Sequence, residues 1–326
     1  MNKASTKTYG GIEAGGTKFI CAVGTGPTDL LTKRVETQTP QKTIDEVVKF
    51  FQPFVVEEAG KRLAAIGIAS FGPLELNKES PRYGYITNTP KPSWMNVNLV
   101  GNISDSLGIP VAIDTDVNGA ALGEQEWGAA QGLNTFVYVT LGTGIGGGGM
   151  INGNLMHGLV HPEMGHIRIP RDNNEKPGFK GSCKFHKPGP RNSPGFSCWE
   201  GLASGASMQQ RWGKPPEEML EGDKNYGRAW NLEANYIAIG LHNLICTLSP
   251  QRIILGGGIM NHINLLEQVR KKVVKLLNGY VPALDSLEKL RNYLVRPALV
   301  DVKSNTSLSG VLGSIVLAKR MCSGGD

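Results

Sequence analysis

The sequence predicts an α/β protein made of two related lobes with a central cleft between them. The chain has 326 residues, 40% of them apolar, and at roughly 150 residues per domain this length favours two domains with separate cores. A plan of strand, glycine turn and strand, followed by helix, strand and helix, occurs twice along the chain. We therefore assign one lobe to residues 1–130 and the other to residues 131–326.

Glycine is the unusual feature of the composition. The chain has 43 glycines, about 13% of its residues, against an ordinary ~7%. Because no low-complexity repeat accounts for them, we expect these glycines at positions where the backbone itself has a role.

The first lobe begins with a strand that enters a glycine turn at residues 10–18, GGIEAGGTK. Further along, Thr43 is typical of a helix N-cap, and Glu46 completes a capping box three residues later. Apolar residues then follow at helical spacing. The other expected elements of this lobe are strands at 19–23, 29–37, 63–69 and 111–114, and a helix at about 117–130.

The second lobe repeats this plan, with a glycine turn at residues 142–149 after an apolar strand. Its expected elements are strands at 135–141, 252–255 and 298–302, and helices at 228–248, 265–277 and 309–321. We expect the last helix, at about 309–321, to pack back on the first lobe. Residues 169–196 are rich in Pro, Gly, Lys and Asn without an apolar period, and a loop of this length inside a compact domain requires a tether if it is ordered.

Charge and cysteine content exclude several classes of protein. The net charge of +6 suits an anionic substrate, but the longest basic cluster, 270–272, is too short for a nucleic-acid-binding arm. No apolar run approaches the ~20 residues of a membrane helix, and residues 1–9 lack the apolar core of a signal peptide. Five cysteines are few for this length, which indicates a reducing compartment. We therefore expect a cytoplasmic protein without nucleic-acid or membrane partners.

The two glycine turns favour phosphate binding. A backbone that approaches a phosphate closely has no room for β-carbons and must offer N–H groups to the oxygens. Either turn alone is equally consistent with a tight hairpin. Two such turns, one in each lobe and each after an apolar strand, favour a polyphosphate site. Neither turn has the spacing of a Walker loop, and the first leads into a strand, whereas a dinucleotide fingerprint opens a helix.

A pair of carboxylates lies where the strand at 111–114 meets the following helix. Asp114 and Asp116 are each consistent with a helix N-cap or with a base that accepts a proton from a substrate hydroxyl. One of the two is expected to be structural, and composition alone does not choose between them.

Four zinc-type ligands border the long loop. They are His166, Cys183, His186 and Cys198, and the Cys183-x-x-His186 spacing is typical of a zinc knuckle. The alternative is two unrelated thiols and two surface histidines. We expect the other cysteines, 21, 246 and 322, to be buried in apolar elements. His157 and His161 lie just before residues 162–166 and are consistent with substrate contact or with solvated loop residues, and we expect the second.

Seven segments together resemble the ROK family of repressors and sugar kinases, in family order and over nearly the whole chain. They are GGIEAGGTK (10–18), DTDVNGAALGE (114–124), TLGTGIGGG (140–148), PEMGH (162–166), the Cys/His cluster, CWEGLASG (198–205) and ILGGGI (254–259). The first two segments are most similar to the bacterial fructokinase branch. The resemblance implies an actin-like, ribonuclease H-like ATPase fold and a kinase that uses ATP and Mg²⁺ to phosphorylate the 6-hydroxyl of a hexose.

The resemblance also implies roles for individual residues. Asp116 matches the catalytic base. Glu163, His166 and Glu200 match positions that bind sugar hydroxyls, Thr115 stands where most members have an Asn that binds sugar, and Asn88 lies in the segment that lines the sugar pocket. The phosphate and adenosine positions are Gly15, Gly16, Thr17 and Lys18 in the first loop, Thr140, Gly142, Thr143 and Gly144 in the second, and Gly256, Gly257 and Gly258 near the adenosine.

Two metals follow from the same resemblance. Members bind a structural Zn²⁺ through a PEMGH-type histidine and nearby cysteines, which here implies His166, Cys183, His186 and Cys198. Glu13 stands where most members have an Asp that organises Mg²⁺ through water. A homodimer is a further expectation from the family.

The implied substrate is fructose, with glucose, mannose or an N-acetylated hexosamine as alternatives. A sugar-responsive repressor of the same family is disfavoured, because only nine residues precede Gly10 and a helix-turn-helix domain needs some tens. A zinc-stabilised scaffold that binds nucleotide without catalysis is disfavoured by Asp116 in its motif.

Overall fold

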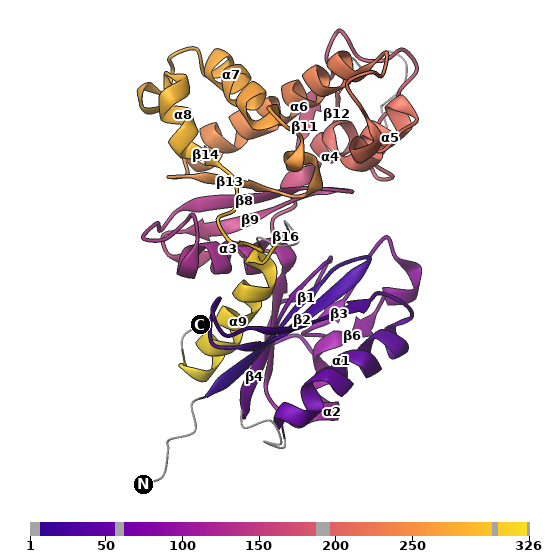
Figure 1. The fold of residues 1–326 in the computed structure, drawn as a ribbon, viewed down its shortest axis with the longest axis vertical. Helices are drawn as coiled ribbons and strands as arrows, with labels where there is room; N and C mark the ends of the chain where they lie inside the picture. The colour runs from indigo at the N-terminus through magenta and orange to yellow at the C-terminus, as the bar shows by residue number, and fades with distance from the viewer. Residues whose placement is uncertain (1–6, 56–61, 187–195, 302–305, 325–326) are drawn as a thin grey trace.

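The computed structural model describes residues 7–55, 62–186, 196–301 and 306–324. It has two lobes, each built around a five-stranded sheet (Figure 1). Residues 187–195 of the expected long loop and Val302 of the expected strand at 298–302 lie outside the described residues. Within the described part of the chain, no helix combines the length and apolarity needed to span a bilayer.

The first sheet has the strand order β3-β2-β1-β4-β7. Its strands are β1 (Thr8–Ala14), β2 (Lys18–Gly24), β3 (Leu31–Glu36), β4 (Leu63–Ser70) and β7 (Val111–Thr115). β1, β2 and β3 are antiparallel, whereas β4 and β7 join as parallel strands. Helices α1 (Pro40–Val55) and α2 (Leu99–Leu107) pack on this sheet through Phe51 and Ile103, and their other face carries polar residues.

The second sheet repeats this arrangement with the order β10-β9-β8-β13-β14. Its strands are β8 (Phe136–Leu141), β9 (Ile145–Ile151), β10 (Asn154–Leu155), β13 (Ile253–Gly256) and β14 (Leu294–Val295). β8, β9 and β10 are antiparallel, and β13 and β14 join as parallel strands. In both sheets three antiparallel strands are therefore followed by two parallel ones, so the plan of the first lobe is repeated in the second. The strand expected at 298–302 is not part of the second sheet: the fifth strand is β14, and Val300–Asp301 pairs with Thr306–Ser307 in a separate hairpin.

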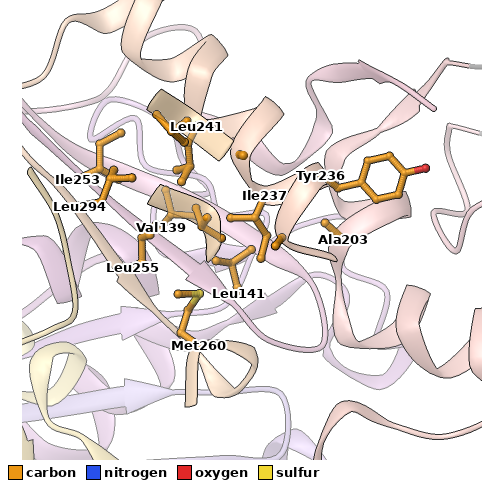
Figure 2. Packing of buried hydrophobic residues seen from close by; sticks show 14 of the residues in the cluster. Val139, Leu141, Ala203, Tyr236, Ile237, Leu241, Ile253, Leu255, Met260 and Leu294 are labelled. Carbon is orange, nitrogen blue, oxygen red and sulfur yellow. The ribbon is translucent and has the colours of Figure 1, made fainter. Parts of the chain in front are cut away.

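Helices α6 (Tyr226–Leu248) and α7 (Leu265–Leu277) close the core of the second lobe. Figure 2 shows Ile237 and Leu241 of α6 against Val139 and Leu255 of the sheet. Tyr236 lies at the edge of this cluster with its hydroxyl pointing away from it (Figure 2), where the hydroxyl accepts the Asp172 N–H at 3.0 Å.

Shorter elements complete the described fold. They are α4 (Trp199–Ala203), α5 (Gly205–Trp212), α8 (Leu287–Tyr293), and the strand pairs β5 (Tyr85–Ile86) with β6 (Val97–Asn98), β11 (Arg168–Pro170) with β12 (Phe196–Cys198), and β15 (Val300–Asp301) with β16 (Thr306–Ser307).

Two helices from distant parts of the chain lie against each other, one between the two sheets and the other on the first sheet (Figure 1). They are α3 (Asp116–Trp127) and α9 (Ser309–Cys322). Glycines permit this contact: a Cβ on Gly67 of β4 would lie 1.9 Å from the Ser314 carbonyl oxygen, and one on Gly313 would lie 1.6 Å from the Gly119 carbonyl oxygen. Because these backbones touch, a larger residue at Gly313 would force α3 and α9 apart, and one at Gly67 would push α9 off β4.

The glycine turns are shorter than the sequence suggested. β1 extends to Ala14 and β2 begins at Lys18, so the first turn is only residues 15–17. β9 begins at Ile145, so the second turn is residues 142–144 and the later glycines belong to the strand. Because these strand glycines have no side chains, residues of α3 can pack closely on the sheet. A Cβ on Gly148, for example, would lie 2.4 Å from Asn118 Oδ1.

Three further expectations were wrong. α1 begins at Pro40 rather than after Thr43, because proline lacks the N–H that the first helical turn leaves unpaired. The Thr43 hydroxyl instead accepts the Gln38 N–H at 2.9 Å. Cys246 and Cys322 are exposed on the outer faces of their helices, although Cys21 is buried as expected.

Candidate active site

The first glycine turn is fixed from outside by Thr37. The Thr37 hydroxyl donates to the Gly15 carbonyl at 2.8 Å, and the Thr37 N–H donates to the Thr17 carbonyl at 3.0 Å. The Gly15 N–H donates to the carbonyl of Lys18 at 2.9 Å. These bonds hold the turn mainly through its carbonyl groups, whereas a bound phosphate would take the N–H groups of the turn.

Lys91 reaches this turn and was missed by the motif analysis. A Cβ on Gly16 would lie 3.8 Å from Lys91 Cε, so the aliphatic end of the lysine lies over the turn. The family resemblance pointed to Asn88, three residues before Lys91, but nothing in the sequence pattern singled out the lysine. A lysine at this position brings a cationic group to the predicted phosphate loop.

The second glycine turn and the glycines after β13 line one cavity. Gly142, Thr143 and Gly258 share a cavity of about 670 Å³ with Trp230 and His262. The rings of Trp230 and His262 are stacked with centroids 3.6 Å apart. A volume of this size suits a small-molecule ligand.

Backbone geometry explains the glycines on this wall. Gly256 pairs with Thr140 across the parallel strands β13 and β8, so the ends of these strands meet at the cavity. Gly257 has a φ of +90°, and a Cβ there would lie 2.3 Å from the Leu141 carbonyl oxygen. Glycine is required at this position both for the left-handed backbone and for the close approach.

Asp114, at the end of β7, is a structural carboxylate. It is 3% exposed, and its Oδ1 accepts the Thr115 N–H at 2.7 Å and Asn118 Nδ2 at 2.9 Å. Its Oδ2 lies 2.8 Å from His157 Nε2, and this hydrogen bond raises the pKa of His157. The Asn118 side chain in turn accepts the Gly149 N–H of β9 at 3.1 Å. Asp114 therefore ties the end of β7 to the second lobe.

Asp116, at the start of α3, has a different environment. Its Oδ1 accepts the Val117 N–H at 2.9 Å, and the residue keeps partial contact with solvent. Desolvation raises the pKa of Asp116 to about 6, and the charges of His161 and Glu163 act on it in opposite directions. A carboxylate with a pKa near neutrality is suited to general-base work.

Glu13 of β1 lies within electrostatic range of Asp116. Desolvation and the negative charge of Asp116 together raise the pKa of Glu13 to about 7, against the opposing positive charge of Lys18. The structure therefore brings together a carboxylate of β1, a carboxylate of α3 and the lysine that begins β2. The Glu13 side chain lies over α9, where a Cβ on Gly310 would be 2.6 Å from Glu13 Cδ.

The loop between β10 and the short helix η2 (Met164–His166) contains Glu163, and η2 itself contains His166, the other two predicted sugar ligands. Glu163 is half-exposed, with its Oε2 3.9 Å from His166 Nε2 and its Oε1 3.7 Å from His161 Nδ1. His161 is only 8% exposed, so the expectation that it is a solvated loop residue was wrong. His157 is 44% exposed at its side chain but is held by Asp114.

Three predicted sugar-binding residues have other contacts or none. Glu200 of α4 accepts the Ile145 N–H at 3.0 Å and so supports the second glycine turn. The Thr115 hydroxyl accepts the Asn118 N–H at 3.2 Å and caps α3. Asn88 has an exposed side chain.

His166, Cys183, His186 and Cys198 form one cluster at the base of α4. Their ligand atoms all lie within 4.8 Å of one another. Cys183 Sγ is 3.5 Å from His186 Nδ1 and 3.8 Å from His166 Nδ1. Four nitrogen and sulfur ligands at these separations fit the tetrahedral shell of a zinc ion, with bonds of about 2.0–2.3 Å. The alternative of two unrelated thiols and two surface histidines does not describe this arrangement.

Comparison with known proteins decides the family, since the family model for ROK proteins matches residues 9–320. The chain belongs to the ROK family. It is 43% identical over 320 residues to a fructokinase of Zymomonas mobilis, covering 97% of this chain and 98% of that protein.

Solved structures of ROK proteins share the fold. The ROK hexokinase from Thermus thermophilus superposes with a TM-score of 0.72 at 25% identity, covering 98% of this chain and all of that one. A ROK glucokinase from Streptomyces griseus, solved with glucose and AMPPNP, superposes with a TM-score of 0.67 at 24% identity, covering 96% of this chain and 99% of that one. The actin-like ATPase fold implied by the sequence motifs is confirmed.

Proposed function

We propose that this chain is a fructokinase that transfers the γ-phosphoryl group of ATP to the 6-hydroxyl of fructose. The observation that carries the proposal is Asp116, a desolvated carboxylate with a pKa of about 6 that interacts with both Glu163 and His161. A carboxylate of this kind beside a half-exposed second carboxylate suits a site that deprotonates one hydroxyl of a polyol and binds others. The relatives named fructokinase support the choice of sugar.

The proposed mechanism assigns one task to each group. Asp116 accepts the proton of the 6-hydroxyl as that oxygen attacks the γ-phosphorus. Glu163 accepts hydrogen bonds from other sugar hydroxyls, with His166 beside it. The N–H groups of the glycine turns at 15–17 and 142–144 bind phosphate oxygens, and residues 256–258 face the adenosine. Phosphoryl transfer depends chiefly on positioning and charge stabilisation, which backbone amides provide.

Mg²⁺ fits the carboxylates of this site. Glu13 and Asp116 raise each other's cost of ionisation, and hard cations take carboxylate oxygens directly or through water. We propose that Glu13 holds the ion, which would neutralise charge on the phosphates. Lys18 and Lys91 supply further positive charge nearby.

Zn²⁺ fits the cluster of His166, Cys183, His186 and Cys198. With four protein ligands no position is open, so the ion would stabilise the fold and would not take part in catalysis. It would fix the segment that carries Glu163 and the helix that carries Glu200. A homodimer, a cytoplasmic location and the division of the chain near residue 130 remain predictions from the sequence.

A coupled ADP-release assay tests the proposed function. Fructose, glucose, mannose and N-acetylmannosamine are each offered with ATP and Mg²⁺, and the highest kcat/KM is expected with fructose. Preference for another hexose would overturn the choice of sugar. ADP release with none of the four would instead favour the nucleotide-binding scaffold.

A further inference from the structure

His161 turns inward from an otherwise exposed loop. Leu159 is fully exposed and Val160 is 64% exposed, whereas His161 is 8% exposed. The loop belongs to the second lobe, and the histidine enters the space between this loop and residues 73–79 of the first lobe. These two segments line an inter-lobe cavity of about 790 Å³ that also contains Glu163.

Both ring nitrogens of His161 face a partner, and the two partners lie in different lobes. Nε2 lies 3.3 Å from the backbone nitrogen of Leu74, in the segment that follows β4. Nδ1 lies 3.7 Å from Oε1 of Glu163. Leu74 N–H is a donor, so Nε2 must be the unprotonated nitrogen, and the proton of the neutral ring is then on Nδ1 and faces Glu163.

This arrangement links the first lobe to a carboxylate of the sugar site. Glu163 is 47% exposed at its side chain, and on its other side Oε2 lies 3.9 Å from His166 Nε2. A half-exposed glutamate has several rotamers available unless neighbours restrict them. His161 restricts one carboxylate oxygen, and its own orientation is set by an N–H from the opposite lobe.

We propose that His161 is a positioning residue that aims Glu163 at the hexose only when the two lobes are together. The backbone N–H of Leu74 orients the imidazole, and the imidazole Nδ1–H orients the carboxylate. This inference rests on the proposed sugar-kinase function and assigns to that site a residue outside its motifs. It also predicts that opening the cleft releases the Leu74 N–H and Glu163 together.

The test compares three variants with a matched control. His161→Leu removes both nitrogens, His161→Gln keeps an acceptor for Leu74 N–H and a donor for Glu163, and Glu163→Gln removes the carboxylate. His242→Leu, a histidine on α6 far along the chain from this loop, is the control. Circular dichroism and thermal melting first establish that each variant folds.

Steady-state kinetics give the first readout. For His161→Leu we expect the hexose KM to rise about tenfold or more, with the ATP KM and kcat within about threefold of wild type, because ground-state and transition-state sugar binding are lost together. His161→Gln should recover most of this loss, and His242→Leu should match wild type. In the Glu163→Gln background, adding His161→Leu should change the hexose KM by less than about twofold, since the two residues act as one unit.

Hydrogen exchange gives a second readout that does not depend on catalysis. The Leu74 amide should exchange at least about tenfold faster in His161→Leu than in wild type, and His161→Gln should restore its protection. Equal rises in the KM of both substrates, a full tenfold effect in the Glu163→Gln background, or unchanged exchange at Leu74 would overturn the inference. If the wild type phosphorylates no hexose, the proposed function fails, and the exchange measurement still decides whether His161 links the lobes.

Discussion

Replacing Asp116 with Asn should abolish most catalysis and yet stabilise the protein. Asn keeps an oxygen that can accept the Val117 N–H but cannot ionise. Burial raises the pKa of Asp116 from 3.8 to about 6, and a rise of that size corresponds to ~3 kcal/mol spent on holding the charge in the folded state. Because the side chain keeps some solvent contact, we expect a net gain of ~1–2 kcal/mol for Asp116→Asn at pH 8.

The stability advantage of Asp116→Asn should increase with pH. Below pH 3.8 the carboxyl is neutral in both the folded and unfolded states, so the substitution has no electrostatic effect there. Between pH 3.8 and about 6 the unfolded chain ionises first, and the advantage of the variant grows. Above about pH 6 the stability advantage of Asp116→Asn over wild type is constant. At pH 5 this advantage should be roughly half of its value at pH 8.

Denaturant unfolding at pH 5 and pH 8 measures this difference, with Asp114→Asn as the matched control. Asp114 is buried and paired with His157, so its substitution should destabilise the fold by ~1–3 kcal/mol. In the coupled assay, Asp116→Asn should lower kcat by about 10²–10⁴-fold. For the wild type, kcat/KM should decrease as the pH is lowered below about 6, because Asp116 becomes protonated. A loss of stability on Asp116→Asn would refute the reasoning and make Asp116 a structural cap.

Two further substitutions test the metal cluster and the joint between distant segments. Cys183→Ser should remove zinc and lower the melting temperature, because a closed four-ligand site contributes folding free energy. Elemental analysis and thermal melting measure the two effects. A wild-type protein that contains no zinc would contradict the prediction. Glu124→Gln should lower the free energy of unfolding by ~2–4 kcal/mol, since this fully buried carboxylate accepts the Ala298 N–H at 3.0 Å and the Ser309 hydroxyl at 2.6 Å. Denaturant unfolding measures this change. A free energy of unfolding within about 0.5 kcal/mol of wild type would count against the proposed role of Glu124.

The family, the fold and the sugar-kinase class were all predictable from the sequence and are confirmed. The reason is physical: tight glycine turns impose narrow requirements on sequence, so motifs such as GGIEAGGTK and TLGTGIGGG are specific. The helix expected near 265–277 has these bounds in the structure, because its apolar spacing is regular. Helix α2 was missed, since its nine residues carry too few apolar positions for a clear period.

The site was predictable only in part. The four members of the Cys/His cluster were predicted from one local spacing, Cys183-x-x-His186, together with the family resemblance, and their ligand atoms lie within 4.8 Å of one another in the structure. Composition alone did not distinguish Asp114 from Asp116, because the structural difference depends on His157, which is 43 residues away from Asp114; only the family resemblance favoured Asp116. The burial of His161 was likewise unpredictable, since its contact with Leu74 spans 87 residues and leaves no local pattern.

The packing of α9 on β1 and β4 has a consequence for biosynthesis. Synthesis proceeds from the N-terminus, so residues 8–115 leave the ribosome long before residues 309–322 exist. Until then, the face of the sheet that packs against Val311 and Ile315 in the native structure exposes its apolar residues to water. Such a delay favours aggregation or chaperone capture, and it makes the order of translation part of how this molecule reaches its native state.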